Sequence, residues 1–151
     1  MATDFDDLVS DLERSYEETQ TRMADPAVYN DHREAADVGR RLKELEQPYK
    51  LAQEWKSARD DLAAAHAACF SMALSAGLSK DGHPPDELRT SATVTFQPGE
   101  GITRVALTVE GRVPGLDEAA FEAAARTAKE NCPVSTALAA VPEISLDAAL
   151  A

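Results

Sequence analysis

The sequence predicts an α+β fold, with an N-terminal antiparallel helical hairpin that runs through one long helix into a small antiparallel β-sheet of about three strands packed with helices. The first observation is that apolar residues recur every three or four positions up to about residue 78, which is the spacing of amphipathic helices. The second is that this spacing changes to two after Pro84-Pro85 and becomes helical again after Pro114-Gly115.

The N-terminal segment predicts two helices joined by a short connector. Thr3 is the expected N-cap of the first helix, which ends before Pro26 because proline disfavours a helical residue ahead of it. Asn30 or Asp31 is expected to cap the second helix. Its apolar stripe keeps its phase across Pro48, so we expect a kink there rather than an end. The two helices are predicted to pair as an antiparallel coiled coil.

The C-terminal segment predicts a hairpin, two helices and a last strand. Residues 92–96 and 105–112 alternate apolar and polar side chains around a glycine-rich turn at 97–101, which indicates a β-hairpin. A helix is predicted over residues 117–131, followed by a short helix. Residues 144–148 alternate again and are predicted to form the last strand.

Composition narrows the classes of partner. The 151 residues carry a net charge of −12 and the pI is about 4.6. Such a surface repels phosphate backbones, so we expect no nucleic acid partner. The acidic N-terminus does not resemble a signal peptide, and the longest apolar stretch, residues 62–78, contains His66 and two serines. We therefore expect a cytoplasmic protein with no membrane span.

Two cysteines carry the candidate chemistry, and each has two interpretations. In a reducing compartment they are expected to be thiols or a catalytic pair rather than a structural disulfide. Cys69 lies mid-helix among alanines, as either a buried inert thiol or a reactive one. Cys132 precedes Pro133 and is expected at a helix N-cap, where the amides favour a thiolate, unless it is only a small capping residue. His66 is either a base toward Cys69 or a packed side chain.

The three histidines are scattered along the chain, so no metal site is predicted with the cysteines, and no cofactor is expected.

Residues 5–62 resemble the N-terminal helical domain of bacterial peptide chain release factors. The run MADPAVYNDHREAADVGRRLKELE at 23–46 carries this resemblance, together with residues 49–62. The stop-codon recognition and Gly-Gly-Gln motifs of that family are missing from the sequence, so translation termination is not expected. By analogy with that domain, the hairpin is a candidate protein-binding module.

Residues 63–151 closely resemble the C-terminal half of the OsmC/Ohr family of thiol peroxidases. The matching segments are AAHAACFSMALS at 64–75, VPGLD at 113–117 and KENCPVS at 129–135. The resemblance implies that Cys69 is the peroxidatic cysteine, that Cys132 is the resolving cysteine, and that a dithiol reductant recycles the pair. Family members also have an activating arginine on N-terminal strands and a glutamate ten positions before the peroxidatic cysteine. Here the hairpin replaces those strands, and Arg59 stands at the glutamate position.

The two resemblances meet inside one helix at residues 62–65. We therefore expect a chimera, made by design or by recombination, with domains at 1–62 and 63–151 and no selected activity; a natural fusion is the alternative origin. The alternative function is a thiol peroxidase that reduces organic hydroperoxides through Cys69 and Cys132. A homodimer is expected, because the lost strands would otherwise expose an apolar face.

Overall fold

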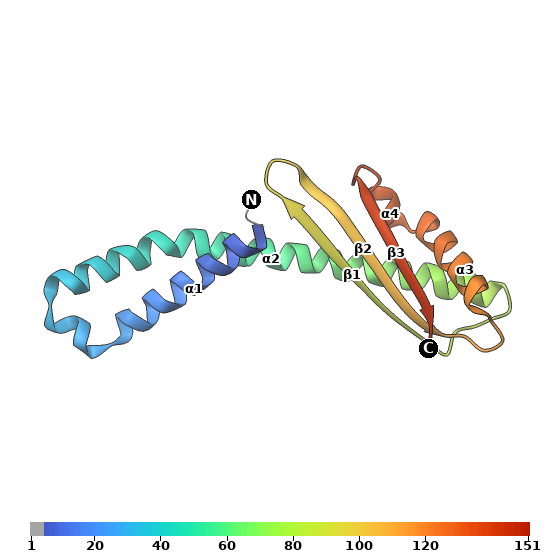
Figure 1. The fold of residues 1–151 in the computed structure, drawn as a ribbon, viewed down its shortest axis with the longest axis horizontal. Coiled ribbons are helices and arrows are strands. Elements are labelled where there is room, and N and C mark those ends of the chain that lie inside the picture. Colours follow the sequence, from blue (N-terminus) through green and yellow to red (C-terminus); the bar gives the residue numbers. More distant parts are fainter. Residues whose placement is uncertain (1–4) are drawn as a thin grey trace. The chain divides into compact units, whose positions relative to one another are not determined.

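The computed structural model describes residues 5–151, so Thr3, the expected N-cap, lies outside the described residues. The chain divides into two compact units, Met1–Ala58 and Arg59–Ala151. Figure 1 shows the order of elements along the chain, in which helix α2 (His32–Lys80) begins in the first unit and ends in the second.

The first unit is a helical hairpin built from α1 (Phe5–Ala24), the 3-10 helix η1 (Pro26–Asn30) and the first part of α2. Two aspartates shape its connector. The Asp25 carboxylate accepts the Ala27 amide at 2.9 Å, and the Asp31 carboxylate accepts the Arg33 amide at 2.8 Å. Asp31, one of the two residues expected at this position, is therefore the cap of α2.

Side-chain pairs show that the two helices of the hairpin run antiparallel. The Phe5 and Trp55 rings meet edge to face at 4.8 Å, and the Tyr16 and Tyr49 rings stack at 4.1 Å. The residue numbers of the α2 partners therefore decrease as those of the α1 partners increase, which is the antiparallel order. Pairs of this kind contribute about 0.5–1.5 kcal/mol beyond the area they bury. The buried aliphatic side chains of this unit are Val9, Val28, Val38, Leu45 and Ala52.

Helix α2 continues through Pro48, as predicted, and is 49 residues long. A proline inside a helix removes one backbone hydrogen bond and costs about 3 kcal/mol. Leu45 and Ala52, one turn to either side of Pro48, are both buried, and their packing offsets this cost.

By length and composition alone, α2 also passes as a membrane-crossing helix, with a mean hydropathy of 1.4 over its most apolar window. This differs from the expectation drawn from residues 62–78. The core helix of a soluble protein passes the same test, so the observation is weak evidence for a membrane span.

The second unit contains a mixed three-stranded sheet with the order β1-β2-β3. β1 (Glu87–Gln97) and β2 (Gly101–Arg112) form the predicted antiparallel hairpin. β3 (Glu143–Leu150) pairs with β2 in parallel, so the prediction of a wholly antiparallel sheet is wrong. The physical reason is the connection, because the two helices between β2 and β3 form a crossover that returns the chain in the same direction.

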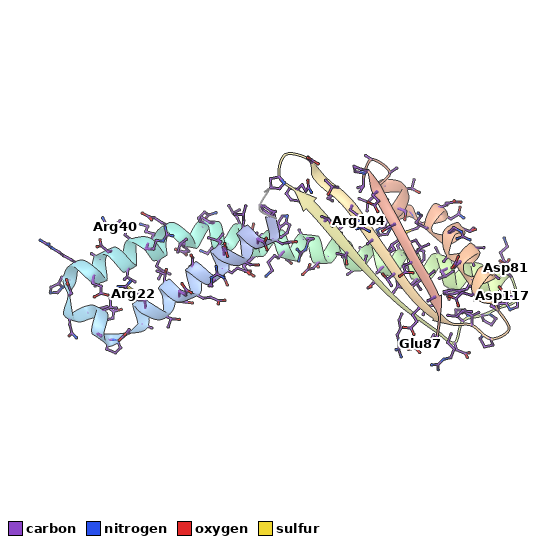
Figure 2. The ribbon with its side chains drawn as sticks, in the orientation of Figure 1. Arg22, Arg40, Asp81, Glu87, Arg104 and Asp117 are labelled. Atoms are coloured by element: carbon purple, nitrogen blue, oxygen red, sulfur yellow. The ribbon has the colours of Figure 1, made fainter. Side chains whose placement is uncertain are left out.

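Those two helices are α3 (Glu118–Asn131) and α4 (Pro133–Ala137). The side chains are drawn in Figure 2, where Asp117 and Arg104 are labelled. The Asp117 carboxylate caps α3 by accepting the Ala120 amide at 2.8 Å. Arg104 on β2 pairs with Glu143 on β3 at 3.3 Å, on the exposed surface of the sheet. The α+β class is therefore confirmed.

The core of the second unit joins α2, β2 and α3. Its fully or nearly fully buried members are Phe70, Leu74, Leu78, Leu107, Val109, Val113, Phe121, Ala125, Ala128 and Cys132. The approach of α3 to the sheet is close at Gly111, where an added Cβ would lie 2.5 Å from Cζ of Phe121. A glycine is therefore required there for packing. This core places one candidate cysteine inside it and the other at its margin.

Candidate active site

The structure brings together the two cysteines that the sequence singled out. Cys69 lies on α2, packs against the core of the second unit and is partly exposed, whereas Cys132 lies between α3 and α4 and is completely buried. Both are free thiols. They face each other closely enough that each sulfur affects the ionisation of the other. Sequence spacing alone did not establish this proximity.

Cys132 occupies the N-cap of α4, as predicted. α3 ends at Asn131, and Pro133 takes the first turn of the new helix, where its missing N–H costs nothing. The backbone of Cys132 is extended, and its carbonyl accepts the Thr136 amide at 3.0 Å. The side chain of Cys132 makes no capping hydrogen bond within the usual distance and angle limits.

The two thiols differ in acidity. Burial raises the pKa of Cys132, but the Ser135 amide, the Cys69 thiol, the Ser135 hydroxyl and the Val134 amide together outweigh burial and lower that pKa. The Val134 amide lowers the pKa of Cys69, but the neighbouring Cys132 sulfur and burial outweigh it and raise that pKa. Each sulfur therefore affects the ionisation of the other, and the two thiols titrate as a pair.

A buried histidine and serine lie beside the pair. His66 is completely buried, and its Nε2 lies 2.8 Å from Oγ of Ser135. Its Nδ1 is buried without a hydrogen-bond partner in the described part of the chain. Burial lowers the pKa of His66, so the imidazole is neutral near pH 7. The sequence left His66 as a base or a packed side chain, and the structure shows it packed and hydrogen-bonded.

Ser135 is the site residue that sequence reasoning missed. It lies three residues after Cys132, at the third position of α4. A side chain at this position of a helix reaches back toward the N-cap, as in the capping box. The spacing of three residues between Cys132 and Ser135 was therefore the sequence signal that could have identified Ser135.

Arg59, at the position where the resemblance expects a glutamate, does not join the site. Its guanidinium pairs with Asp60 at 3.1 Å. Ten residues of α-helix separate it from Cys69, which is about 15 Å along the helix axis. The groups that shift the pKa of both thiols are a backbone amide, burial and the neighbouring cysteine, with the Ser135 amide and hydroxyl acting on Cys132 as well; no arginine in residues 5–151 is among them.

A groove of about 420 Å³ lies between α2 and α3 in the second unit. Ala73, one turn after Cys69, and Ala128, one turn before Cys132, both line it. Most of the remaining lining is aliphatic, with Leu74, Leu78 and Leu116 contributing. Across residues 5–151, no group of three or more His, Cys, Asp and Glu side chains is placed to hold a metal ion. The arrangement therefore offers thiol chemistry beside a small apolar groove.

Comparison with known proteins identifies this part of the chain. The model of the OsmC-like protein family matches residues 57–147, so the chain belongs to that family. It is 46% identical to peroxiredoxin OsmC of Escherichia coli K12 over 89 residues, which are 57% of this chain and 61% of that protein. The relative from Shigella flexneri matches to the same extent. The chain thus spans about 61% of the length of these curated relatives.

Solved structures of OsmC-like proteins share the fold of part of this chain. An OsmC-like protein from Mycoplasma pneumoniae superposes with a TM-score of 0.54 at 18% identity, covering 60% of this chain and 68% of that one. An OsmC-like protein of unknown function from Vibrio cholerae gives a TM-score of 0.52 at 16% identity, covering 60% and 62%.

A separate match of 58 residues, 40% identical, is to peptide chain release factor 1 of Acidothermus cellulolyticus. It covers 38% of this chain and 16% of that protein.

Proposed function

We propose that the chain is a thiol-dependent peroxidase that reduces organic hydroperoxides through Cys69 and Cys132. The observation that carries this proposal is the meeting of the two thiols at the margin of the core of the second unit. Membership of the OsmC-like family and the 46% identity to a peroxiredoxin support it.

The proposed chemistry assigns different roles to the two sulfurs. Cys69 is the sulfur that peroxide can reach, because it is partly exposed whereas Cys132 is buried. The Cys69 thiolate attacks one peroxide oxygen, the O–O bond breaks, and the alkoxide takes a proton to leave as an alcohol. The Cys132 thiolate then attacks the Cys69 sulfenic acid, the S–O bond breaks as the disulfide forms, and the departing hydroxide takes a proton to become water. A dithiol reductant restores both thiols.

The groove supports the choice of an organic hydroperoxide over hydrogen peroxide. Its aliphatic lining begins one helical turn from each cysteine. An alkyl tail gains free energy by leaving water for such a surface, whereas hydrogen peroxide has no apolar part to bury.

The match to a release factor supports a two-part origin of the chain as a second proposal. In this view residues 1–62 derive from a release-factor-like hairpin and residues 63–151 from an OsmC-like protein, and the cysteine pair is vestigial. The groups that shift the pKa of Cys69 favour that view, because they are the Val134 amide, Cys132 and burial rather than an arginine. The homodimer, the dithiol reductant and the cytoplasmic location stay predictions.

Peroxide turnover separates these two proposals. The full chain is mixed with an organic hydroperoxide and an excess of a dithiol reductant, and loss of peroxide is followed. The peroxidase proposal predicts turnover that Cys69→Ser abolishes. Cys132→Ser is the matched control, because it keeps the first step and prevents the disulfide. Peroxide loss no faster than with the reductant alone would support the vestigial pair.

A further inference from the structure

A buried hydrogen bond ties the helix that carries Cys69 to the short helix that Cys132 caps. The Nε2 atom of His66 on α2 lies 2.8 Å from the Oγ atom of Ser135 on α4. His66 is completely buried, and Ser135 is only 9% exposed. Cys69 follows His66 by three residues, and Cys132 precedes Ser135 by three. Each end of this hydrogen bond is therefore about one helical turn from one of the two thiols.

Helix α4 depends on contacts of this kind for its position. It has only five residues, and a helix this short is not stable through its own backbone hydrogen bonds. Its position must therefore come from side chains that pack against the rest of the second unit. Ser135 is the buried residue within α4, and Val134 packs against the core from a partly buried position. The hydrogen bond between His66 and Ser135 is thus an attachment on which the position of Cys132 depends.

The unpartnered nitrogen of His66 determines where the imidazole hydrogen lies. Its Nδ1 atom is buried and has no hydrogen-bond partner among the described residues. A buried N–H without an acceptor is rarer and costlier than a lone pair without a donor. The neutral ring therefore carries its hydrogen on Nε2 and donates it to Ser135 Oγ. A second proton would have to bind Nδ1, which would leave a buried, charged ring with an N–H that has no acceptor.

We propose that His66 and Ser135 are positioning residues that form an acid-sensitive clamp, which holds α4 against α2 and keeps Cys132 beside Cys69 until His66 is protonated. The clamp is the hydrogen bond from Nε2 of the imidazole to the Ser135 hydroxyl. The closed site has no acceptor for a second N–H, whereas opening of α4 lets water solvate the charged ring. Acid therefore favours the open form, in which Cys132 has moved away from Cys69. The purpose of the clamp rests on the proposed function, although its opening does not.

The surroundings of His66 contain no charged side chain that would supply this pH dependence instead. Residues 62–79 of its own helix contain no Asp, Glu, Lys or Arg, and neither do residues 131–142 around α4. The buried side chains of β2 and α3 are also uncharged, and they are Val105, Leu107, Val109, Phe121, Ala125 and Ala128. The titratable groups of the cluster besides His66 are Cys69 and Cys132, and acid does not give a thiol a charge. Burial lowers the pKa of His66, which agrees with a ring that resists protonation while the clamp is closed.

The test measures how often α4 opens, and it uses no peroxide. Cys69→Ser is introduced into the full chain so that Cys132 is the remaining thiol. Because Cys132 is completely buried, a thiol reagent reaches it only when the site opens, and its rate of reaction without denaturant reports the opening equilibrium. In this background His66→Leu removes the hydrogen bond and is expected to speed the reaction by about tenfold near pH 7. His66→Gln keeps a side-chain N–H donor that does not titrate, and is expected to restore the slow rate.

Acid provides the readout that a merely structural hydrogen bond would not change. The rate of reaction of Cys132 is compared at each pH between the chain with His66 and its His66→Gln variant, so that the changing reactivity of the thiol itself cancels. The ratio of the two rates is expected to rise severalfold, and at most about tenfold, between about pH 7.5 and about pH 5.5, because the open form binds a proton with the ordinary histidine pKa near 6.5. A ratio that does not change with pH overturns the clamp. So does a His66→Leu variant that reacts no faster than its parent, or one that glutamine at the same position does not improve on.

Reaction with peroxide then separates the clamp from the proposed function. The full chain with both cysteines is treated with an organic hydroperoxide near pH 7. If the two thiols fail to react while the labelling of Cys132 still depends on pH through His66, the peroxidase proposal is wrong and the clamp stands. If the thiols form a disulfide while the labelling of Cys132 shows no such dependence, the clamp is wrong and the peroxidase proposal stands.

Discussion

Gly111→Ala tests whether the packing that holds α3, and with it Cys132, is as close as the structure shows. The new methyl group would lie 2.5 Å and 2.7 Å from two carbons of the Phe121 ring and 3.1 Å from Cδ2 of Leu88. Phe121 is completely buried, so its ring has no route to solvent. Gly111 lies in the central strand, paired with Leu88 and Leu150, so the backbone is also held.

The expected cost lies in the upper part of the range for overpacking, about 2–3 kcal/mol of the free energy of unfolding of the second unit. For a unit of this size, that corresponds to a fall in Tm on the order of 10 °C. Gly77→Ala is the matched control, because an added Cβ there meets nothing within 4 Å. It replaces glycine inside a helix and is expected to stabilise by about 0.5–1 kcal/mol.

The assay follows each unit separately. The tryptophan and all three tyrosines lie in Met1–Ala58, so fluorescence reports on the first unit. Cys132 is completely buried, so its reaction with a thiol reagent in a Cys69→Ser background reports on the second. Gly111→Ala should shift the urea midpoint of thiol exposure and leave that of fluorescence unchanged. A Gly111→Ala protein as stable as its parent would refute the packing argument.

Three further predictions use the same probes. Burial lowers the pKa of His66, so the unfolded state binds a proton that the folded state does not as pH falls below about 6.5. The free energy of unfolding of the second unit should therefore decrease below that pH. His66→Gln should make this decrease smaller. The Lys56 hydrogen bond lowers the pKa of Glu13, so this pair stabilises the first unit near pH 7 and the stabilisation is lost as pH falls through the folded pKa. Glu13→Gln should lower the free energy of unfolding of the first unit by under about 1 kcal/mol at pH 7. Equal fluorescence midpoints for the variant and its parent at pH 7 would contradict this. Asp117→Ala removes the cap of α3 and should lower the stability of the second unit by about 1 kcal/mol, measured by thiol exposure; no change would show that the cap is dispensable.

Most of the elements could be predicted from the sequence because their signals are local. The apolar stripe keeps its phase across Pro48, which predicted that α2 continues through that residue. The change in apolar spacing from three or four residues to two predicted the position of the β-hairpin. The direction of β3 could not be predicted in this way, because alternation marks a strand without saying which neighbour it pairs with. That direction depends on how α3 and α4 cross over the sheet.

Part of the candidate site could likewise be predicted from local signals, and part depends on the packing of distant elements. Cys132 at a helix N-cap followed from Pro133 beside it. The proximity of Cys69 to Cys132 came from the resemblance, because it depends on the packing of α2 against α4 rather than on spacing. The contact between His66 and Ser135 depends on the same packing, which is why sequence reasoning left one residue undecided and missed the other.

The proposed reaction requires Cys69 and Cys132 to act as one redox pair. One equivalent of an organic hydroperoxide is added to the reduced full chain, and the loss of free thiols is counted against time, with Cys132→Ser as the control. We expect rapid loss of both thiols within one chain, and loss of the single remaining thiol in the control. Loss of thiols no faster than for an ordinary exposed cysteine would contradict it, and would leave a protein that has kept the fold of its family without the reaction.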